Sequence, residues 1–275
     1  MKTTLLLTVA LFFTAHVCLA QQFEGIATYK TDRKVDLDMA GDGINDAMKD
    51  QIAAQLRKQF QKEFTLTFNK NESIYEEVES LNAPAPKATG GIDIMISGGS
   101  DILYRNLTNN KYVNKTEISG KEFLIKDTLE KPEWTLEKET RNIGNYTCFK
   151  AIRSREVTEK QMTSESDSLI EVTKLVTITA WYTLDLPIQH GPSTYWGLPG
   201  LILQVEDGDL TVLCSKIVLN PKEEIAIEVP KKGKKVTQAE FDEIQEKKNA
   251  EMMERFQSDG RKKGDGNSFS IKIGG

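Results

Sequence analysis

Short strand-like segments recur along this chain at regular intervals, and turn-forming residues separate them. Strands of this length and spacing are typical of an antiparallel meander. The longest segment, residues 170–183, has one apolar face: Val172, Val176, Ile178, Ala180 and Tyr182. A hairpin turn is predicted at residues 206–209, and the last strand at residues 224–229. The fold class that follows is mainly β (α+β), with a single strongly curved antiparallel sheet, or half-barrel.

Two segments carry helical rather than strand periodicity. After Asn45, apolar residues recur every four positions: Met48, Ile52, Leu56 and Phe60. They predict an early amphipathic helix that either packs on the sheet or forms a lid over a cavity. Thr237-Gln238-Ala239-Glu240 is a capping box that opens a C-terminal helix. Residues 258–275 are polar and glycine-rich, which predicts a flexible tail after one β-rich domain at residues 21–257.

The first twenty residues have the pattern of a secretory signal peptide. Lys2 supplies the positive charge, residues 5–13 supply the apolar region, and Cys18-Leu19-Ala20 supplies the cleavage site. Cleavage after Ala20 predicts a periplasmic or secreted protein without a transmembrane segment in the mature chain. In the alternative interpretation, Cys18 is the lipidated cysteine of an outer-membrane lipoprotein.

The charge balance argues against a nucleic-acid partner. The chain has 36 Lys and Arg against 41 Asp and Glu, a net charge of -5, and its basic residues are spread among the acids. After the leader, two cysteines remain, Cys148 and Cys214, in strand-like segments. Export to an oxidising compartment favours a disulfide between them. The alternative is two separate buried thiols.

Motifs of catalysis are scarce. Apart from His16 in the leader, His190 is the one histidine, which excludes triads and metal sites that need several. The sequence has no G-x-S-x-G elbow, phosphate loop or dinucleotide fingerprint. We therefore predict no catalytic residue, no metal and no cofactor. A carboxylate-based hydrolase is the remaining enzymatic alternative, and its acid pair needs geometry to identify.

A turn rich in glycine, proline and aromatic residues lies at 190–200 between two strand-like segments. Pro199-Gly200 suits a type II turn. Two interpretations apply to its aromatic residues: a plug that closes one end of the sheet, or a patch that grips an apolar ligand or a partner. The candidate ligand- or partner-binding residues are Tyr182, His190, Tyr195, Trp196, Gly197, Leu198, Pro199 and Gly200.

Residues 197–202 spell Gly-Leu-Pro-Gly-Leu-Ile, and the chain resembles the GLPGLI family, exported proteins that abound in Bacteroidetes. Trp181-Tyr182, Gly191-Pro192 and residues 145–151 are similar to the same family's central block. The function of that family is not established. Its members are often encoded near TonB-dependent outer-membrane receptors, so the resemblance implies a role in envelope transport.

Two further expectations come with this resemblance. The order of strands with an early helix is similar to the Lol-type lipoprotein carriers, which hold an apolar cavity in a half-barrel. In Bacteroidetes, an Asp-Ser/Thr-apolar tripeptide is an O-glycosylation site, which makes Thr128 and Ser168 candidates.

Three functions remain. The first is a non-enzymatic envelope protein that binds an apolar ligand (a lipid or a peptide) or assists a TonB-dependent receptor in outer-membrane transport. The second is a structural interaction module without a ligand cavity. The third is the carboxylate-based hydrolase.

Overall fold

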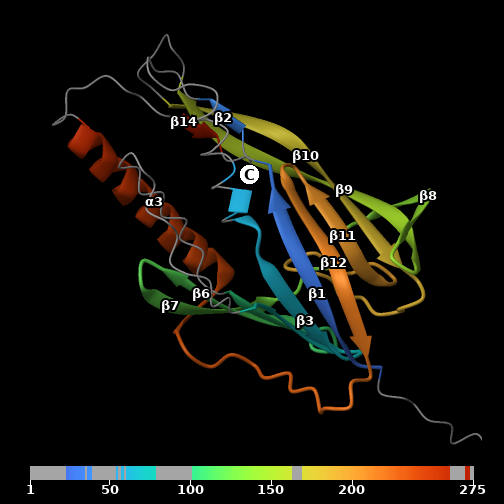
Figure 1. Cartoon of the computed structure of the whole chain (residues 1–275). Helices are drawn as coiled ribbons and strands as arrows, with labels where there is room; N and C mark the ends of the chain where they lie inside the picture. Colours follow the sequence, from blue (N-terminus) through green and yellow to red (C-terminus); the bar gives the residue numbers. More distant parts are fainter. Residues whose placement is uncertain are drawn as a thin grey trace, which may run out of the picture.

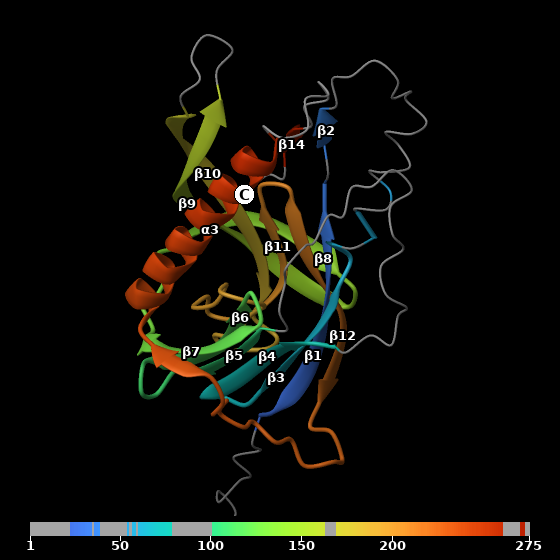
Figure 2. The ribbon, with the colours of Figure 1, turned by 90° about the vertical axis from the view of Figure 1, so that its left-hand side faces the viewer.

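The computed structural model describes residues 23–34, 36–38, 54, 57–58, 60–78, 101–162, 169–260 and 270–272. Twelve strands form one open, curved sheet (Figures 1 and 2). They are β1 (Gly25–Arg33), β3 (Glu63–Phe68), β4 (Glu72–Glu77), β5 (Ile102–Asn106), β6 (Lys111–Ile118), β7 (Lys121–Thr128), β8 (Thr135–Ile143), β9 (Tyr146–Met162), β10 (Leu169–Thr183), β11 (Leu201–Asp207), β12 (Leu210–Leu219) and β13 (Lys234–Val236). The mainly-β prediction is confirmed.

The strand order is β13-β7-β6-β5-β4-β3-β1-β12-β11-β10-β9-β8. Two meanders, β3 to β7 and β8 to β12, are therefore joined through β1 at the centre. All neighbours pair in antiparallel fashion except β13 and β7, which are parallel. At this edge the sheet differs from the antiparallel prediction. A hairpin cannot join parallel strands, and β13 instead arrives through the long connection that follows β12.

The strand predicted at residues 224–229 is also wrong, because these residues pair with no strand. Their alternation has another origin. Ile227 packs on Tyr104, Val113 and Leu124, on the face of β5 to β7 opposite to Leu103 and Tyr112. An extended segment that lies against a sheet can alternate like a strand without joining its hydrogen-bond ladder.

The helix α3 (Gln238–Gly260) runs across the open side of the sheet (Figures 1 and 2). Its capping box is formed as predicted. The Thr237 N–H donates to the Glu240 carboxylate at 2.8 Å, and the Glu240 N–H donates to Thr237 Oγ1 at 3.2 Å. Phe241 packs edge-on against Phe123 of β7, with ring centroids 5.5 Å apart. The predicted C-terminal helix is confirmed, and it is anchored to the sheet at its N-terminal end.

Several predictions fall wholly or mainly outside the described residues: the leader, most of the early helix and most of the tail. Within the tail, α3 extends to Gly260, and β14 (Ser270–Lys272) pairs with β2 (Asp36–Asp38) in a second, two-stranded sheet. Among the described residues, no helix is long and apolar enough to cross a membrane.

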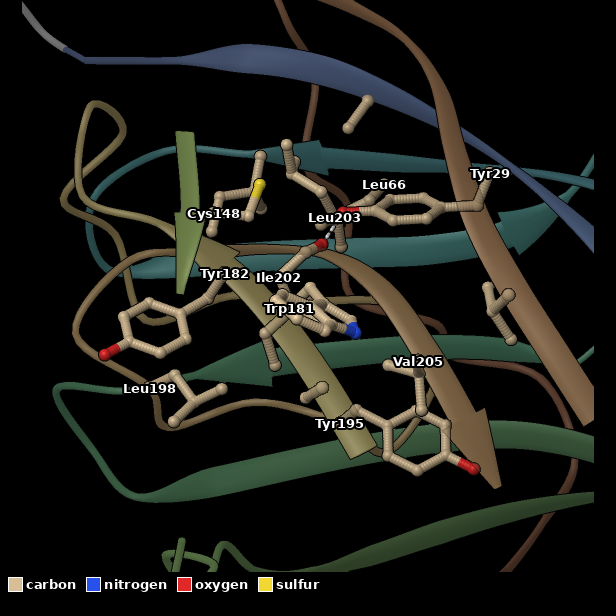
Figure 3. Packing of buried hydrophobic residues seen from close by; sticks show 14 of the residues in the cluster. Tyr29, Leu66, Cys148, Trp181, Tyr182, Tyr195, Leu198, Ile202, Leu203 and Val205 are labelled. Atoms are coloured by element: carbon tan, nitrogen blue, oxygen red, sulfur yellow. Dashed lines mark hydrogen bonds between the residues drawn. The ribbon is translucent and has the colours of Figure 1, made fainter. Parts of the chain in front are cut away.

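The largest group of buried residues joins β1, β3, β10 and β11 to the segment between β10 and β11 (Figure 3). Tyr29 spans this core, and its hydroxyl donates to the Ile202 carbonyl at 2.7 Å. Leu66, Ile202 and Leu203 surround it and have almost no exposed surface. The core thus ties the two meanders together across the inside of the curve.

The expected disulfide between Cys148 and Cys214 is not formed, and both residues are free thiols. Cys148 lies on β9 and Cys214 on β12, with β10 and β11 between them. Three strand spacings of about 4.8 Å separate their backbones by roughly 14 Å along the sheet. A disulfide needs Cα atoms about 4.4–6.8 Å apart.

Candidate functional site: a cavity above an internal plug

Residues 184–200, which we call the plug, leave β10, fold inside the curve of the sheet and return as β11. The Leu201 N–H donates to the Leu186 carbonyl at 2.9 Å, and the Gly197 N–H donates to the Gln189 carbonyl at 3.0 Å. The plug also reaches the opposite meander. There, His190 Nε2 lies 3.0 Å from the Asn69 carbonyl, and Arg105 donates to the Gly191 carbonyl. These contacts fix the plug between the two halves of the sheet.

The glycines of the plug allow close approach of the backbone. A Cβ at Gly200 would lie 1.9 Å from the Thr183 carbonyl oxygen, and one at Gly191 would lie 2.5 Å from the Tyr195 carbonyl oxygen. Gly197, with φ of 90°, is the plug glycine in the left-handed region. Gly200 is not in that region, so the predicted type II turn at Pro199-Gly200 is wrong. Glycine is required at position 200 because the backbone of Thr183 lies too close for a side chain, and not because of a turn.

Most of the predicted ligand-binding residues lie in the core. Tyr182, Tyr195 and Leu198 are buried (Figure 3). The Tyr195 hydroxyl donates to the Asp207 carboxylate at 2.8 Å. Pro199 is exposed, whereas Gly197 and Gly200 are buried. Within the predicted set, Trp196 lines the cavity described below. The plug interpretation therefore describes most of these residues, and Trp196, itself buried, is the one that borders the cavity.

His190 is fully buried and is not part of the cavity wall. Burial lowers its pKa to about 3, and the nearby Arg105 charge acts in the same direction. The imidazole is therefore neutral at physiological pH. With Asn69 accepting from Nε2–H, the other ring nitrogen, Nδ1, has no partner among the described residues.

A cavity of about 760 Å³ lies inside the curve of the sheet, next to the plug. Ser193, Thr194 and Trp196 of the plug form part of its wall, and Gln238 at the start of α3 forms another part. Strand residues form the rest. Much of this wall is apolar or aromatic, including Phe64, Tyr75, Leu103, Tyr112, Leu210 and Val212. The rings of Phe64 and Tyr75 are stacked, with centroids 5.0 Å apart.

Charged side chains also line the cavity, and they differ in burial. Arg105 of β5 exposes 1% of its surface, and burial lowers its pKa to about 10. Its guanidinium donates to the Gly191 carbonyl over 3.3 and 3.4 Å. Arg153 of β9 lies over the Trp134 ring, 5.4 Å from its centroid. These arginines could not be identified from the sequence, because a single arginine in a strand carries no pattern that distinguishes it from a surface residue.

Two carboxylates of the cavity wall are relevant to the hydrolase alternative. Glu77 forms an ion pair with Lys62 at 2.8 Å. Partial burial at the cavity wall raises the pKa of Asp101, and a hydrogen bond with Thr116 opposes this shift. Neither was singled out from the sequence. Among the described residues, no group of three or more His, Cys, Asp or Glu side chains could hold a metal ion.

The candidate glycosylation residue Thr128 is exposed at the end of β7, where its N–H donates to Asp127 at 2.8 Å. Asp127 also accepts from the Gln238 N–H at 3.0 Å, which links this strand end to α3. Ser168 lies outside the described residues.

Residues 134–204 match the model of a family described as a protein of unknown function, Porph_ging. The match begins in front of β8 and ends within β11, so it includes the plug and Trp196. No curated protein matches the chain significantly. Two solved structures of PNGF-II, in the C2 and P21 space groups, resemble it at 16% identity, with TM-scores of 0.46 and 0.45. The similarity covers 80% and 81% of this chain, but the chain spans only 32% of the length of PNGF-II.

Proposed function

We propose that this protein is a non-enzymatic, exported envelope protein that binds an apolar or amphipathic ligand, a lipid or a peptide, in the cavity above the plug. One observation carries the proposal: a space of about 760 Å³ with a largely apolar and aromatic wall inside the curved sheet. Pockets of small-molecule ligands measure about 300–1,000 Å³ and have walls of this kind. Each buried CH₂ of such a ligand contributes about 0.8 kcal/mol.

The way the wall is held also supports the proposal. The strands that carry the wall residues are paired on both sides, and the plug is hydrogen-bonded to both meanders, through Asn69 and Arg105 on one side and through Asp207 on the other. A cavity framed in this way keeps its shape when it is empty, so little ordering free energy opposes binding. The start of α3 supplies Gln238 to the same wall, so a helix as well as strands borders the cavity.

Membership of the GLPGLI family, export by a cleaved leader and action beside a TonB-dependent receptor belong to the same proposal. They rest on the hexapeptide at residues 197–202, on the leader pattern of residues 1–20 and on the match of residues 134–204 to a family of unknown function. The structural-module alternative differs in one respect, since it assigns no occupant to the cavity.

The first test is native mass spectrometry of the mature protein purified from its own periplasm, before and after organic extraction. A co-purifying apolar mass that extraction removes is the expected result. A bare protein that also fails to bind added amphiphiles would overturn the proposal in favour of the structural module. A bound molecule recovered in cleaved form after incubation, and recovered intact with Asp101→Asn, would instead establish the hydrolase.

Two variants of the plug test the location of the site. Thr194 is exposed and faces the cavity, so Thr194→Trp should fill the space and weaken ligand binding about tenfold or more without removing a core contact. Trp196→Ala should weaken binding as well, and it also leaves a cavity that lowers the free energy of unfolding by about 3–5 kcal/mol. Isothermal titration calorimetry with laurate measures the binding affinity of both variants.

The matched control is Ser154→Trp, which places the same side chain on an exposed position of β9 outside the cavity wall. It should bind laurate like the wild type. Equal affinity of Thr194→Trp and Ser154→Trp would place the ligand elsewhere.

A further inference from the structure

The cavity holds two cations without a carboxylate partner among the residues that the structure describes. Arg105 is fully buried, and its hydrogen bonds are two long contacts to one backbone carbonyl, that of Gly191. Arg153 is partly buried, and its Nε is inaccessible to solvent and has no hydrogen-bond partner. Both line the same cavity.

Each of the two arginines has a buried tyrosine within electrostatic range. The charge of Arg105 acts on Tyr75, the charge of Arg153 acts on Tyr195, and Tyr75 and Tyr195 are within electrostatic range of each other. The tyrosines do not neutralise the arginines. Burial raises the pKa of both phenols, so they stay uncharged at physiological pH.

The acids of the cavity wall do not neutralise them either. Glu77 is paired with Lys62, and Asp127 accepts the backbone N–H groups of Thr128 and Gln238. The remaining acids of the wall, Asp101 and Glu130, keep solvent-exposed surface. Within the described part of the chain, no carboxylate acts on the charge of Arg105, and the groups that do are Tyr29 and Tyr75.

A buried cation without a counter-charge is costly, and proteins normally pair it. The planar guanidinium group suits a carboxylate or a phosphate, which it can bind through two parallel hydrogen bonds. We propose that Arg105 and Arg153 bind the anionic head group, a carboxylate or a phosphate, of an amphipathic ligand whose apolar chain lies against Phe64, Tyr75 and Leu103. This inference rests on the proposed function and names the chemical class of the ligand.

The test compares amphiphiles with the same chain and different heads: laurate, dodecyl phosphate and 1-dodecanol, each titrated calorimetrically into the mature protein. We expect the wild type to bind at least one of the anions about tenfold or more tightly than the alcohol, which is the range of a charge-assisted hydrogen bond. The stronger of the two anions identifies the head group. Acetate and inorganic phosphate, which lack a chain, should bind far more weakly than the amphiphile with the same head.

Arg105→Gln and Arg153→Gln should each reduce the preference for the anion over the alcohol by several-fold, while the affinity for 1-dodecanol changes little. Lys126→Gln removes the same charge from an exposed position of β7 outside the cavity wall, and it should keep the full preference. Because Arg105 is buried, circular dichroism checks the folding of its variant. If that variant does not fold, the anion preference of Arg153→Gln, at the more exposed arginine, tests the head-group assignment alone.

Each other outcome has a defined meaning. Equal binding of the alcohol and the anions by the wild type overturns the head-group assignment and leaves the apolar cavity in place. A preference that survives in both arginine variants also overturns it. Absence of binding for all three amphiphiles overturns the proposed function itself.

Discussion

At the scale of single residues, Gly200 of the plug has no space for a side chain. Gly200→Ala would place a methyl group 1.9 Å from the Thr183 carbonyl oxygen, a backbone atom that cannot move aside alone. We expect the free energy of unfolding to fall by about 2–3 kcal/mol, measured by urea denaturation.

Gly144→Ala is the matched control, because Gly144 has φ of 58° and a Cβ added there would meet nothing within 4 Å. Its cost should be the backbone strain alone, about 1 kcal/mol. If the two variants lose the same free energy, close packing is not the reason for glycine at 200.

His190 gives the stability of the protein a specific pH dependence. Its folded-state pKa is lowered to about 3, first by burial and then by Arg105, whereas an unfolded chain titrates near the ordinary value of 6.5. Between these two values, unfolding takes up a proton, so stability falls as the pH falls from about 6.5 towards 3. Above pH 6.5 this contribution is fully present.

Urea unfolding of the wild type and of His190→Gln over pH 3 to 8 gives two curves of the free energy of unfolding against pH. The difference between the two curves measures this effect. The glutamine amide keeps a donor for the Asn69 carbonyl and does not titrate. The variant should therefore lose less stability on acidification than the wild type. Parallel curves would show that His190 titrates alike in the folded and unfolded states.

At the scale of elements, α3 depends on its first turn, where both its capping box and its contact with β7 lie. Thr237→Ala removes the side-chain acceptor of the Glu240 N–H and should destabilise the start of the helix by about 1 kcal/mol. Hydrogen exchange of the first-turn amides should accelerate about fivefold. Lys247→Ala, exposed in the middle of α3, should leave those rates unchanged. Equal rates in both variants would show that packing, not the cap, holds this turn.

The strands were predictable from sequence where a hairpin or a long alternation marked them. The turn after β11 and the alternation of β10 are examples, because both signals are local. The edge strand β13 was not predictable, since Lys234–Val236 is too short for a pattern and pairs with β7 more than a hundred residues away. Conversely, Ile227 produced a strand-like pattern by packing on the sheet without pairing.

The same distinction applies to the site. The sequence marked the plug, because its glycines, prolines and aromatic residues are adjacent in the chain. It could not show that Trp196 alone of that set would line the cavity, since Tyr182, Tyr195 and Leu198 are equally suited to an apolar wall. Arg105 and Arg153 come from different meanders, and only the closure of the curve brings both to one wall.

For the whole molecule, the position of β1 sets a condition on how the chain reaches this structure. β1 lies at the centre of the sheet between β3 and β12, with Gly25 opposite Leu219. The two meanders can form locally, but they cannot be joined until β12 has been synthesised. Pairings so distant in sequence slow folding. We therefore expect the complete sheet to form only after β12 has been synthesised, which suits the export that we propose.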